Sequence, residues 1–332
     1  MALLSHDPIY SEDLEKQELI GSGGFGDVYK ARHKGLGFDV AVKKPRQHTK
    51  SLNKEADHMS KVSCEFVLRI YGIYLEKSGG GNYMQKGIVM EFMQRGSIQT
   101  LQKDLSGPPP WPLAFRLAHQ VALGINFLHE KRLIHHDLKP SNVLLDKDLN
   151  AKLADFGLAR DSTSAMISSE ELVKEIGGSY KYMPPEAFHL SYNPCRAFDS
   201  YSYGILLWSI FTAKEPYPDE KNVQRPPCDE LELIAVNGMT EMVALMKRCW
   251  DKEPRKRPQF KECCEITERM YSEHEKGIDD AVREVKTRLA EKTTQKKMRA
   301  LRGTLLSGIK VKAAFYDALK RNHPMLVESL DG

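Results

Sequence analysis

The sequence predicts an α+β fold in two lobes, a strand-rich lobe at residues 12–93 and a helical lobe at residues 97–272, followed by a helical, basic extension at residues 273–332. The first observation is a series of short apolar segments with glycine-rich turns, which ends near residue 93. The second is the helical spacing of apolar residues in the long segments that follow. With 332 residues, of which 41% are hydrophobic, the chain is long enough for one large domain and an appendage.

The strand-rich lobe begins with a hairpin at residues 19–30, where apolar segments flank a glycine cluster. Gly21, Gly23 and Gly26 have the spacing G-x-G-x-x-G, and the missing side chains let backbone N–H groups lie over the phosphates of a nucleotide. The same spacing occurs in dinucleotide-binding turns and in ordinary glycine-rich hairpins, so this motif alone is weak. The strand at residues 40–43 strengthens it, because its terminal Lys43 could contact those phosphates.

Three further segments complete this lobe. Residues 51–62 have helical spacing and offer two candidate carboxylates to orient Lys43, namely Glu55 and Asp57. Residues 67–75 predict another strand, and residues 87–93 predict an apolar strand that leads into the second lobe.

The helical lobe is predicted from two segments. After three prolines at residues 108–110, apolar residues recur at helical spacing through residues 113–129. Residues 199–208, which end in the apolar run 204–208, indicate a fully buried helix. A polar segment rich in Ser and Glu, residues 161–179, lies between them and predicts a mobile loop.

The C-terminal extension is amphipathic and basic. Its apolar residues keep helical spacing: Ile278, Val282, Val285 and Leu289. Residues 281–321 hold twelve Lys or Arg and three acidic residues, a net charge of +9, whereas residues 1–280 carry −3. One hypothesis is that this extension binds nucleic acid or an anionic membrane in a salt-dependent manner. The interleaved apolar residues favour the solvated faces of packed helices, so we expect no nucleic-acid partner.

Cysteine spacing and hydropathy bear on the cellular compartment. The six cysteines form no Cys-x-x-Cys pair, and the sequence has no run of 18 apolar residues and no apolar N-terminal signal segment. We therefore expect a reduced, soluble, cytoplasmic protein without structural zinc and without a membrane span.

The most informative stretch is the segment from Leu133 to Asn142, which is followed thirteen residues later by Asp155. Two apolar segments, residues 143–145 and 151–153, predict a strand pair that returns Asp155 to the preceding loop. In this layout Asp137 could accept a hydroxyl proton, Lys139 could neutralise a phosphate, and Asn142 and Asp155 could hold Mg²⁺. A polar loop between buried strands explains any one of these residues but not all four at this spacing.

These motifs resemble those of a eukaryotic protein kinase over about residues 12–290. His135-His136-Asp137, Trp111-Pro112-Leu113 and Tyr182-Met183-Pro184-Pro185-Glu186 narrow the resemblance to the receptor-interacting protein kinase family, whose second and third members look closest. The resemblance implies a bilobal kinase fold and the cofactors ATP and Mg²⁺. It favours Glu55 over Asp57, because Met59 then takes the place of an apolar residue that stacks on Phe156.

The resemblance also implies roles for individual residues. Asp199 would brace the catalytic loop, Arg257 would pair with Glu186, and His136 replaces the arginine that grips a phosphorylated activation segment in most regulated kinases. The expected catalytic residues are Asp137, Lys139, Lys43 and Glu55, and the expected metal ligands are Asn142 and Asp155. The expected ATP-binding residues are Ile20, Gly21, Ser22, Gly23, Gly24, Phe25, Gly26, Val28, Ala41, Lys43, Met90, Glu91 and Met93.

The function implied is a serine/threonine kinase that phosphorylates itself and a downstream signalling protein in innate-immune, inflammatory or programmed cell-death signalling (necroptosis). Self-association of the kinase domain is expected to switch it by bringing Glu55 against Lys43. The alternative is a pseudokinase scaffold that signals by conformational change, which would be marked by loss of Lys43, Asp137 or Asp155; all three are present. The sequence leaves open whether the chain acts in a cell-death or a caspase-recruitment branch.

Overall fold

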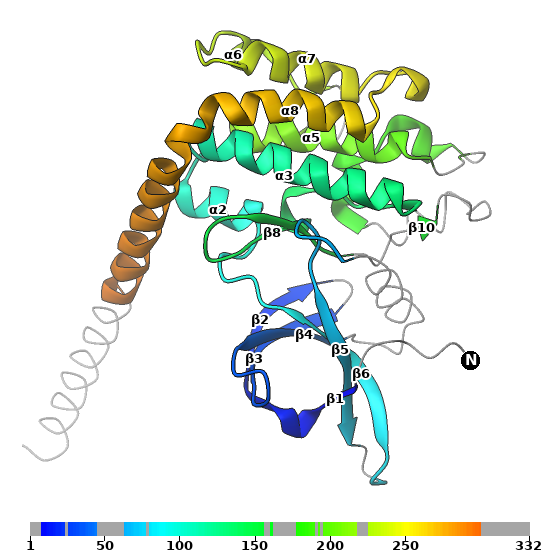
Figure 1. Cartoon of the computed structure of the whole chain (residues 1–332), viewed down its shortest axis with the longest axis vertical. Helices are drawn as coiled ribbons and strands as arrows, with labels where there is room; N and C mark the ends of the chain where they lie inside the picture. Colours follow the sequence, from blue (N-terminus) through cyan, green and yellow to red (C-terminus); the bar gives the residue numbers. More distant parts are fainter. Residues whose placement is uncertain are drawn as a thin grey trace, which may run out of the picture. The chain divides into compact units, whose positions relative to one another are not determined.

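The computed structural model describes residues 8–23, 26–44, 63–77, 80–155, 160–161, 177–189, 192, 195–217 and 225–299. The chain divides into two compact units, residues 1–282 and 283–332. The first unit has the predicted α+β architecture, with a strand-rich lobe followed by a helical lobe (Figure 1). In the second unit, residues 283–299 are helical.

Six strands of the first lobe form one curved sheet in the order β1-β5-β6-β4-β3-β2 (Figure 1). Strands β2 and β3 make the predicted glycine hairpin, in which Gly23 pairs with Gly26. Strand β5 begins later than predicted, because Val67 instead bridges to Leu153 of the helical lobe. The bounds are β1 Pro8–Tyr10, β2 Leu14–Gly23, β3 Gly26–His33, β4 Asp39–Lys44, β5 Ile70–Lys77 and β6 Tyr83–Glu91.

The helical lobe is built around α3 and α5. Pro110 precedes the first turn of α3 and Pro112 lies within it, where a missing N–H costs no intrahelical hydrogen bond. Helix α5 is buried from Phe198 to Phe211, which agrees with the predicted fully buried helix, and its polar residues Asp199, Ser200, Ser202 and Ser209 are buried as well. The bounds are α2 Ile98–Leu105, α3 Trp111–Glu130, α5 Ala197–Thr212, α6 Asp229–Glu232, α7 Met239–Cys249 and α8 Phe260–His274. Short 3₁₀ helices are η1 Ser11–Asp13, η2 Pro140–Asn142, η4 Gly177–Tyr182, η5 Pro185–Phe188, η6 Pro254–Lys256 and η7 Glu275–Gly277.

Two smaller strand pairs connect the helices. Strand β7 (Leu133–Ile134) pairs with β10 (Arg160–Asp161), and β8 (Val143–Leu145) pairs with β9 (Ala151–Leu153). The second pair is the one predicted from the apolar segments around the loop. The predicted helix at residues 51–62 lies outside the described residues. Beyond η7, residues 278–282 are helical, in agreement with the predicted helical spacing.

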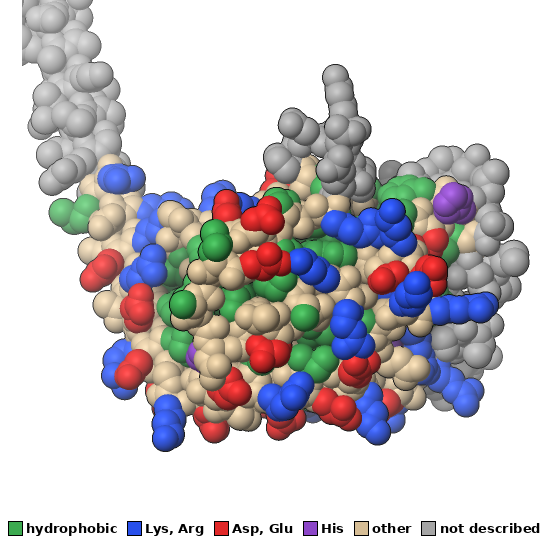
Figure 2. Space-filling model, turned by 90° about the horizontal axis from the view of Figure 1, so that it is seen from above, with side chains coloured by type: hydrophobic (Ala, Val, Ile, Leu, Met, Phe, Trp, Pro, Cys, Tyr) green, Lys and Arg blue, Asp and Glu red, His purple; other side chains and the backbone are tan. Residues whose placement is uncertain are grey.

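The surface of the helical lobe carries mixed charge. Figure 2 shows Lys and Arg side chains interspersed with Asp and Glu on the face that is seen from above. Several are paired, such as Arg248 of α7 with Glu262 of α8, whose nitrogen and oxygen lie 2.5 Å apart. Among the described residues, no helix is both long enough and apolar enough to cross a bilayer.

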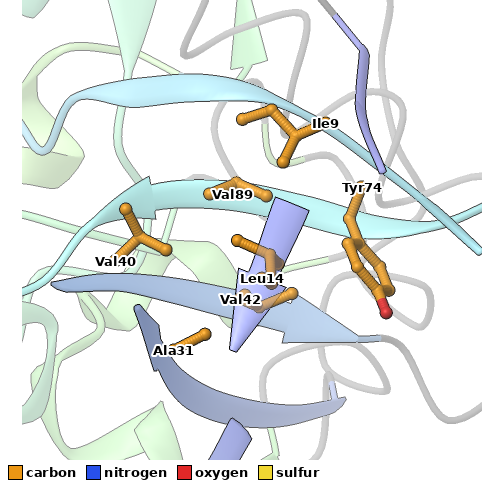
Figure 3. Close-up of a cluster of buried hydrophobic side chains, with 7 residues drawn as sticks. All are labelled: Ile9, Leu14, Ala31, Val40, Val42, Tyr74 and Val89. Atoms are coloured by element: carbon orange, nitrogen blue, oxygen red, sulfur yellow. The ribbon is translucent and has the colours of Figure 1, made fainter. Parts of the chain in front are cut away.

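The core of the strand-rich lobe includes a strand that precedes the glycine hairpin. Figure 3 shows Ile9 of β1 and Leu14 of β2 among Val40, Val42, Val89, Ala31 and Tyr74. Strand β1 runs parallel to β5, with Ile9 opposite Tyr74. Ile9 is only 6% exposed, so this short strand supplies part of the hydrophobic core and covers the edge of β5.

Replacing Ile9 with alanine is therefore expected to destabilise the protein by about 2–3 kcal/mol, because the removed methyl and methylene groups leave a cavity beside Tyr74. Urea unfolding followed by fluorescence would measure the change. The matched control is Leu36→Ala, since Leu36 is 45% exposed and its truncation leaves no cavity. Equal effects of the two changes would mean that β1 does not contribute to the core.

Candidate active site

The loop that carries the predicted catalytic residues lies between β7 and β8. A side chain of α5 holds this loop by hydrogen bonds. Asp199, on the first turn of α5, is completely buried. Its Oδ2 accepts hydrogen bonds from the backbone N–H of His135 at 2.9 Å and from Nε2 of His129 at 2.8 Å. Its Oδ1 accepts one from the N–H of His136 at 3.0 Å. Asp199 therefore braces the loop in the way the resemblance implied.

Burial alone would raise the pKa of Asp199, but the hydrogen bond and charge of His129 outweigh burial and hold that pKa below its ordinary value. The carboxylate is therefore ionised at neutral pH. As an anion it can accept all three hydrogen bonds at once.

Asp137 is held by two side chains of its own loop. The ammonium of Lys139 lies 3.0 Å from Oδ1 and 2.8 Å from Oδ2 of Asp137. The amide nitrogen of Asn142 donates to Oδ2 at 2.7 Å and to the backbone carbonyl of Asp137 at 2.8 Å. Because the Asn142 nitrogen is used in this way, its amide oxygen is directed elsewhere and remains suited to a metal ion.

His135 joins the catalytic loop to the residue before Asp155. Its Nδ1 accepts the N–H of Asp137 at 3.2 Å, so Nδ1 carries no proton. Its Nε2 lies 3.1 Å from the carbonyl oxygen of Ala154 and must donate to it. The neutral Nε2–H tautomer is therefore the one that fits both bonds, and the fully buried ring fixes the loop relative to Asp155.

Lys43 of β4 meets Asp155 across the lobes, with 3.1 Å between its Nζ and Oδ1 of Asp155. Burial raises the pKa of Asp155, but the charge and hydrogen bond of Lys43, with the charge of Lys139, prevail and lower it. Gly87 of β6 permits the close approach of β4, because a Cβ there would lie 2.3 Å from the carbonyl oxygen of Lys43. Asp155 has φ of +62°, a left-handed conformation that is uncommon for a non-glycine residue and is often found at functional sites.

Lys43, Asn142 and Asp155 lie in the wall of a cavity of about 360 Å³ between the lobes. Ten of the residues predicted from the sequence lie in its wall: Ile20, Gly21, Val28, Ala41, Lys43, Met90, Glu91, Met93, Asn142 and Asp155. The strands of the first lobe form one side of the cavity, and the catalytic loop with the β8–β9 pair forms the other side.

The remaining predicted residues lie outside this wall or outside the described residues. Ser22, Gly23 and Gly26 are in the hairpin but not in the wall, and Asp137 and Lys139 lie in the loop that supplies Asn142. Gly24, Phe25 and Glu55 lie outside the described residues, so the pairing of Lys43 with Glu55 stays a prediction.

Sequence reasoning missed several wall residues: Leu68, Phe92, Gly96, Ser97, Thr100, Ser141, Leu144 and Ala154. Leu144 could have been predicted, because alternation along β8 turns it away from the buried Val143 and Leu145. The hydroxyl of Ser97 accepts the N–H of Thr100 and so caps α2, which brings this polar turn to the mouth of the cavity.

Glu186 and Arg257 form the predicted ion pair, with two parallel bonds of 2.5 and 2.9 Å. The side chain of Arg257 is fully buried and also donates to the carbonyl oxygens of Ala197 and Asp251. This pair ties the segment before α5 to the segment before α8 and has no part in the cavity between the lobes.

Comparison with known proteins accords with this geometry. The family described as "Protein tyrosine and serine/threonine kinase" matches residues 14–267. The chain is 37% identical over 295 residues to human receptor-interacting serine/threonine-protein kinase 3, covering 84% of this chain and 56% of that protein. The chain belongs to the receptor-interacting serine/threonine-protein kinase family.

Two other relatives support this membership. The rat receptor-interacting serine/threonine-protein kinase 3 is 34% identical over 331 residues, which cover 94% of this chain and 68% of the rat protein. Human receptor-interacting serine/threonine-protein kinase 1 is 31% identical over 319 residues, which cover 88% of this chain and 46% of that protein. The chain thus spans between about half and two thirds of the length of these family members.

Within this family member, Met90 is expected to limit access to the space behind the cavity. Met90 is 7% exposed, lies in the wall and pairs with Ala41 of β4. We expect Met90→Gly to increase the affinity of an ATP-competitive inhibitor with a bulky group behind β6 by at least about tenfold, because the long methionine side chain is removed. Met84→Gly is the control, because Met84 lies at the exposed end of β6. Unchanged affinity in Met90→Gly would place Met90 away from the inhibitor.

Proposed function

We propose that this chain is an active serine/threonine protein kinase that transfers the γ-phosphate of Mg-ATP to itself and to partner proteins. One observation carries the proposal. The carboxylate of Asp137, bound by Lys139 and Asn142, lies in the loop that also supplies a wall of the cavity lined by Lys43 and Asp155. The loop and the cavity wall therefore bring together the groups that phosphoryl transfer needs around a bound nucleotide. Asp137 is the candidate base, Asn142 and Asp155 are the candidate metal ligands, and Lys43 and Lys139 supply two ammonium groups.

The donor atoms suit magnesium. Asn142 offers an amide oxygen and Asp155 a carboxylate, both in the wall of the same cavity, and hard oxygen ligands are those that Mg²⁺ prefers. Mg²⁺ held by these residues would neutralise negative charge on the nucleotide phosphates. Lys43 would contact the phosphates, and Lys139 would place a second cation near the transferred group.

Asp137 would accept the proton of the acceptor hydroxyl. Its hydrogen bonds with Lys139 and Asn142 fix the direction of the carboxylate, so the acceptor meets it in one orientation. Backbone groups of Glu91, the last residue of β6, and of Met93, two residues later, would pair with the edge of the adenine ring.

The acceptor residue is expected to be serine or threonine, because Lys139 stands two residues after Asp137, as in serine/threonine kinases. Three peptides that differ only in a central Ser, Thr or Tyr would test this with radiolabelled Mg-ATP. We expect labelling of the Ser and Thr peptides at rates at least about tenfold above that of the Tyr peptide. Faster labelling of the Tyr peptide would contradict the substrate class, and the absence of transfer to any peptide or to the chain itself would favour the scaffold alternative.

The names of the relatives support a place in signalling downstream of receptors. We propose a cytoplasmic kinase whose substrates are itself and a downstream signalling protein in innate-immune, inflammatory or cell-death signalling. Self-association that brings Glu55 against Lys43 is proposed as its main switch.

The position of His136 supports switching by self-association rather than by phosphorylation of the activation segment. His136 is 1% exposed, and its ring packs edge-on against Phe198 with 4.9 Å between ring centres. A buried imidazole cannot replace the exposed fork of donors with which an arginine would bind a phosphate. Ser164, Ser168 and Ser169 lie outside the described residues, as does the side chain of Ser179.

We therefore expect dephosphorylation to lower the initial rate by less than about tenfold, or about 1.4 kcal/mol, whereas enforced dimerisation should raise it. The measurement compares phosphatase-treated and untreated enzyme at one fixed concentration, followed by a dilution series. Changing Ser164, Ser168, Ser169 or Ser179 to alanine should likewise cost less than about tenfold. A loss of about a hundredfold that is recovered on rephosphorylation would show that another basic group binds the phosphate.

A further inference from the structure

A second cavity, of about 530 Å³, lies in the helical lobe and is separate from the cavity between the lobes. It is bounded by the end of α3, the start of α5 and the segment that leads from η6 into α8, which meet at the same end of the helical layer (Figure 1). Its volume is within the range of about 300–1,000 Å³ that is typical of small-molecule sites. None of the catalytic or nucleotide-binding residues lines it.

The wall of this second cavity is held in place by internal contacts. Ser200 of α5 donates to the carbonyl oxygen of Pro258 at 2.9 Å. The guanidinium of Arg257 is committed to Glu186 and to the carbonyl oxygens of Ala197 and Asp251. The buried ring of Phe260 meets the ring of His129 edge-on, with 5.1 Å between centres. The cavity is therefore formed before any ligand arrives.

The charge of the wall is positive. Three exposed basic residues lie in this wall: Arg196 just before α5, Arg255 in η6 and Lys261 in the first turn of α8. Glu130 is the acidic residue in the wall, and its carboxylate accepts a hydrogen bond from Asn126 at 3.0 Å. Within the described part of the chain, no ion pair involves these three basic residues, whereas the buried Arg257 is already neutralised by Glu186. Three basic side chains against one acid leave an excess of positive charge at the wall.

We propose that this second cavity binds a phosphate monoester, carried either by a small molecule or by a phosphorylated side chain. A phosphate monoester has a charge of −1.5 to −2 at neutral pH and three acceptor oxygens, which can meet two guanidinium groups and one ammonium group at the same time. The volume beyond the phosphate accommodates the group that carries it. The alternative is that Arg196, Arg255 and Lys261 are ordinary solvated surface residues without a ligand. Their position in the wall of one concave cavity favours a binding site instead.

The site is connected to the catalytic loop through His129. A ligand in the cavity would touch the ring of His129, which bonds to Asp199, and Asp199 holds the N–H groups of His135 and His136. Binding would therefore restrain the loop that carries Asp137. This consequence rests on the proposed function, whereas binding itself does not.

The test measures binding without catalysis. O-phospho-L-serine is titrated against the full chain and followed by its ³¹P NMR line width, and L-serine is titrated as the uncharged-side-chain comparison by calorimetry. The double variant Arg196→Glu and Lys261→Glu should weaken binding of O-phosphoserine at least about tenfold, since two charge-assisted contacts become repulsive. Both changes place a carboxylate at the start of a helix, where it is tolerated, so folding is retained.

Lys252→Glu is the control for a change of charge outside the cavity, because it makes the same change of charge as one of the two substitutions, on an exposed residue of the segment before η6 that does not line the cavity. It should change affinity by less than about threefold. A phosphoserine peptide and the same peptide without phosphate then identify the source of the phosphate monoester. Tighter binding of the phosphopeptide than of free O-phosphoserine indicates a phosphorylated side chain, and weaker binding indicates a small molecule. Equal binding by the double variant and the parent chain, equal binding of L-serine, or no binding at all would overturn the proposal.

Discussion

Asp137→Asn is expected to lower the rate of phosphate transfer by a factor on the order of 10²–10⁴ while leaving ATP affinity within about twofold of the parent. The carboxylate of Asp137 is held by Lys139 and Asn142 so that it can accept a proton from the acceptor hydroxyl. The amide of asparagine has nearly the same shape but cannot act as a base. Because Asp137 is not in the wall of the nucleotide cavity, nucleotide affinity should not depend on it.

Asp155→Asn is the matched comparison, because it makes the same chemical change in the wall of the cavity. It removes a proposed magnesium ligand and the charge that meets Lys43 at 3.1 Å. We expect loss of both transfer and Mg-dependent nucleotide binding. Titrating a fluorescent ATP analogue with and without Mg²⁺ measures the second effect. If the two variants bind the nucleotide equally well, the roles assigned to Asp137 and Asp155 are wrong.

Asp199→Asn is expected to produce the largest loss of stability, about 3–5 kcal/mol, together with loss of transfer. The asparagine side chain has one oxygen in place of two, so it cannot accept all three hydrogen bonds that the carboxylate accepts. Its new amide N–H groups would face the backbone N–H of His135 or of His136. Chemical denaturation would measure the stability. His129→Leu is the graded control, since leucine offers no hydrogen-bond donor and the change leaves both backbone bonds to Asp199, and it should cost less than half as much.

The pH dependence of this effect follows from the lowered pKa of Asp199. A carboxyl group whose folded pKa is depressed contributes stability that is present above its unfolded value, about 3.9, and is lost as pH falls through the folded value. The parent chain and Asp199→Asn should therefore differ fully near neutral pH and converge in strongly acidic solution. A difference that grew on acidification below about pH 4 would contradict the assignment of an ionised Asp199.

Much of the fold could be predicted from local patterns. Alternation and glycine spacing identified the β2–β3 hairpin and β4, and the largely apolar and aromatic segment 199–208 identified α5 as a buried helix. Strand β1 was missed, because three residues carry too little periodicity and its place depends on pairing with the distant β5. The late start of β5 also depends on a distant contact, because Val67 forms a backbone bridge with Leu153 of β9.

The candidate site was predicted best where residues follow motifs, and poorly where residues merely face the same cavity. Lys43, Asn142 and Asp155 could be named because phosphoryl transfer demands those groups at that spacing. Leu68 and Thr100 lie in the same wall, but their positions are set by how the lobes and α2 pack. The second cavity had no sequence signature at all, because Arg196 and Lys261 are 65 residues apart and meet only through the packing of α5 and α8.

The most direct test of the account follows two labels on one nucleotide. The full chain is incubated with Mg-ATP that carries one isotope in the γ-phosphate and another in the adenine, and protein-bound label is measured over time in the parent chain and in Asp137→Asn. We expect the γ-label alone to accumulate on serine and threonine in the parent chain, and Asp137→Asn to reduce the rate of this labelling by at least about a hundredfold. No γ-label on the parent chain, or equal labelling of the two proteins, would contradict this prediction.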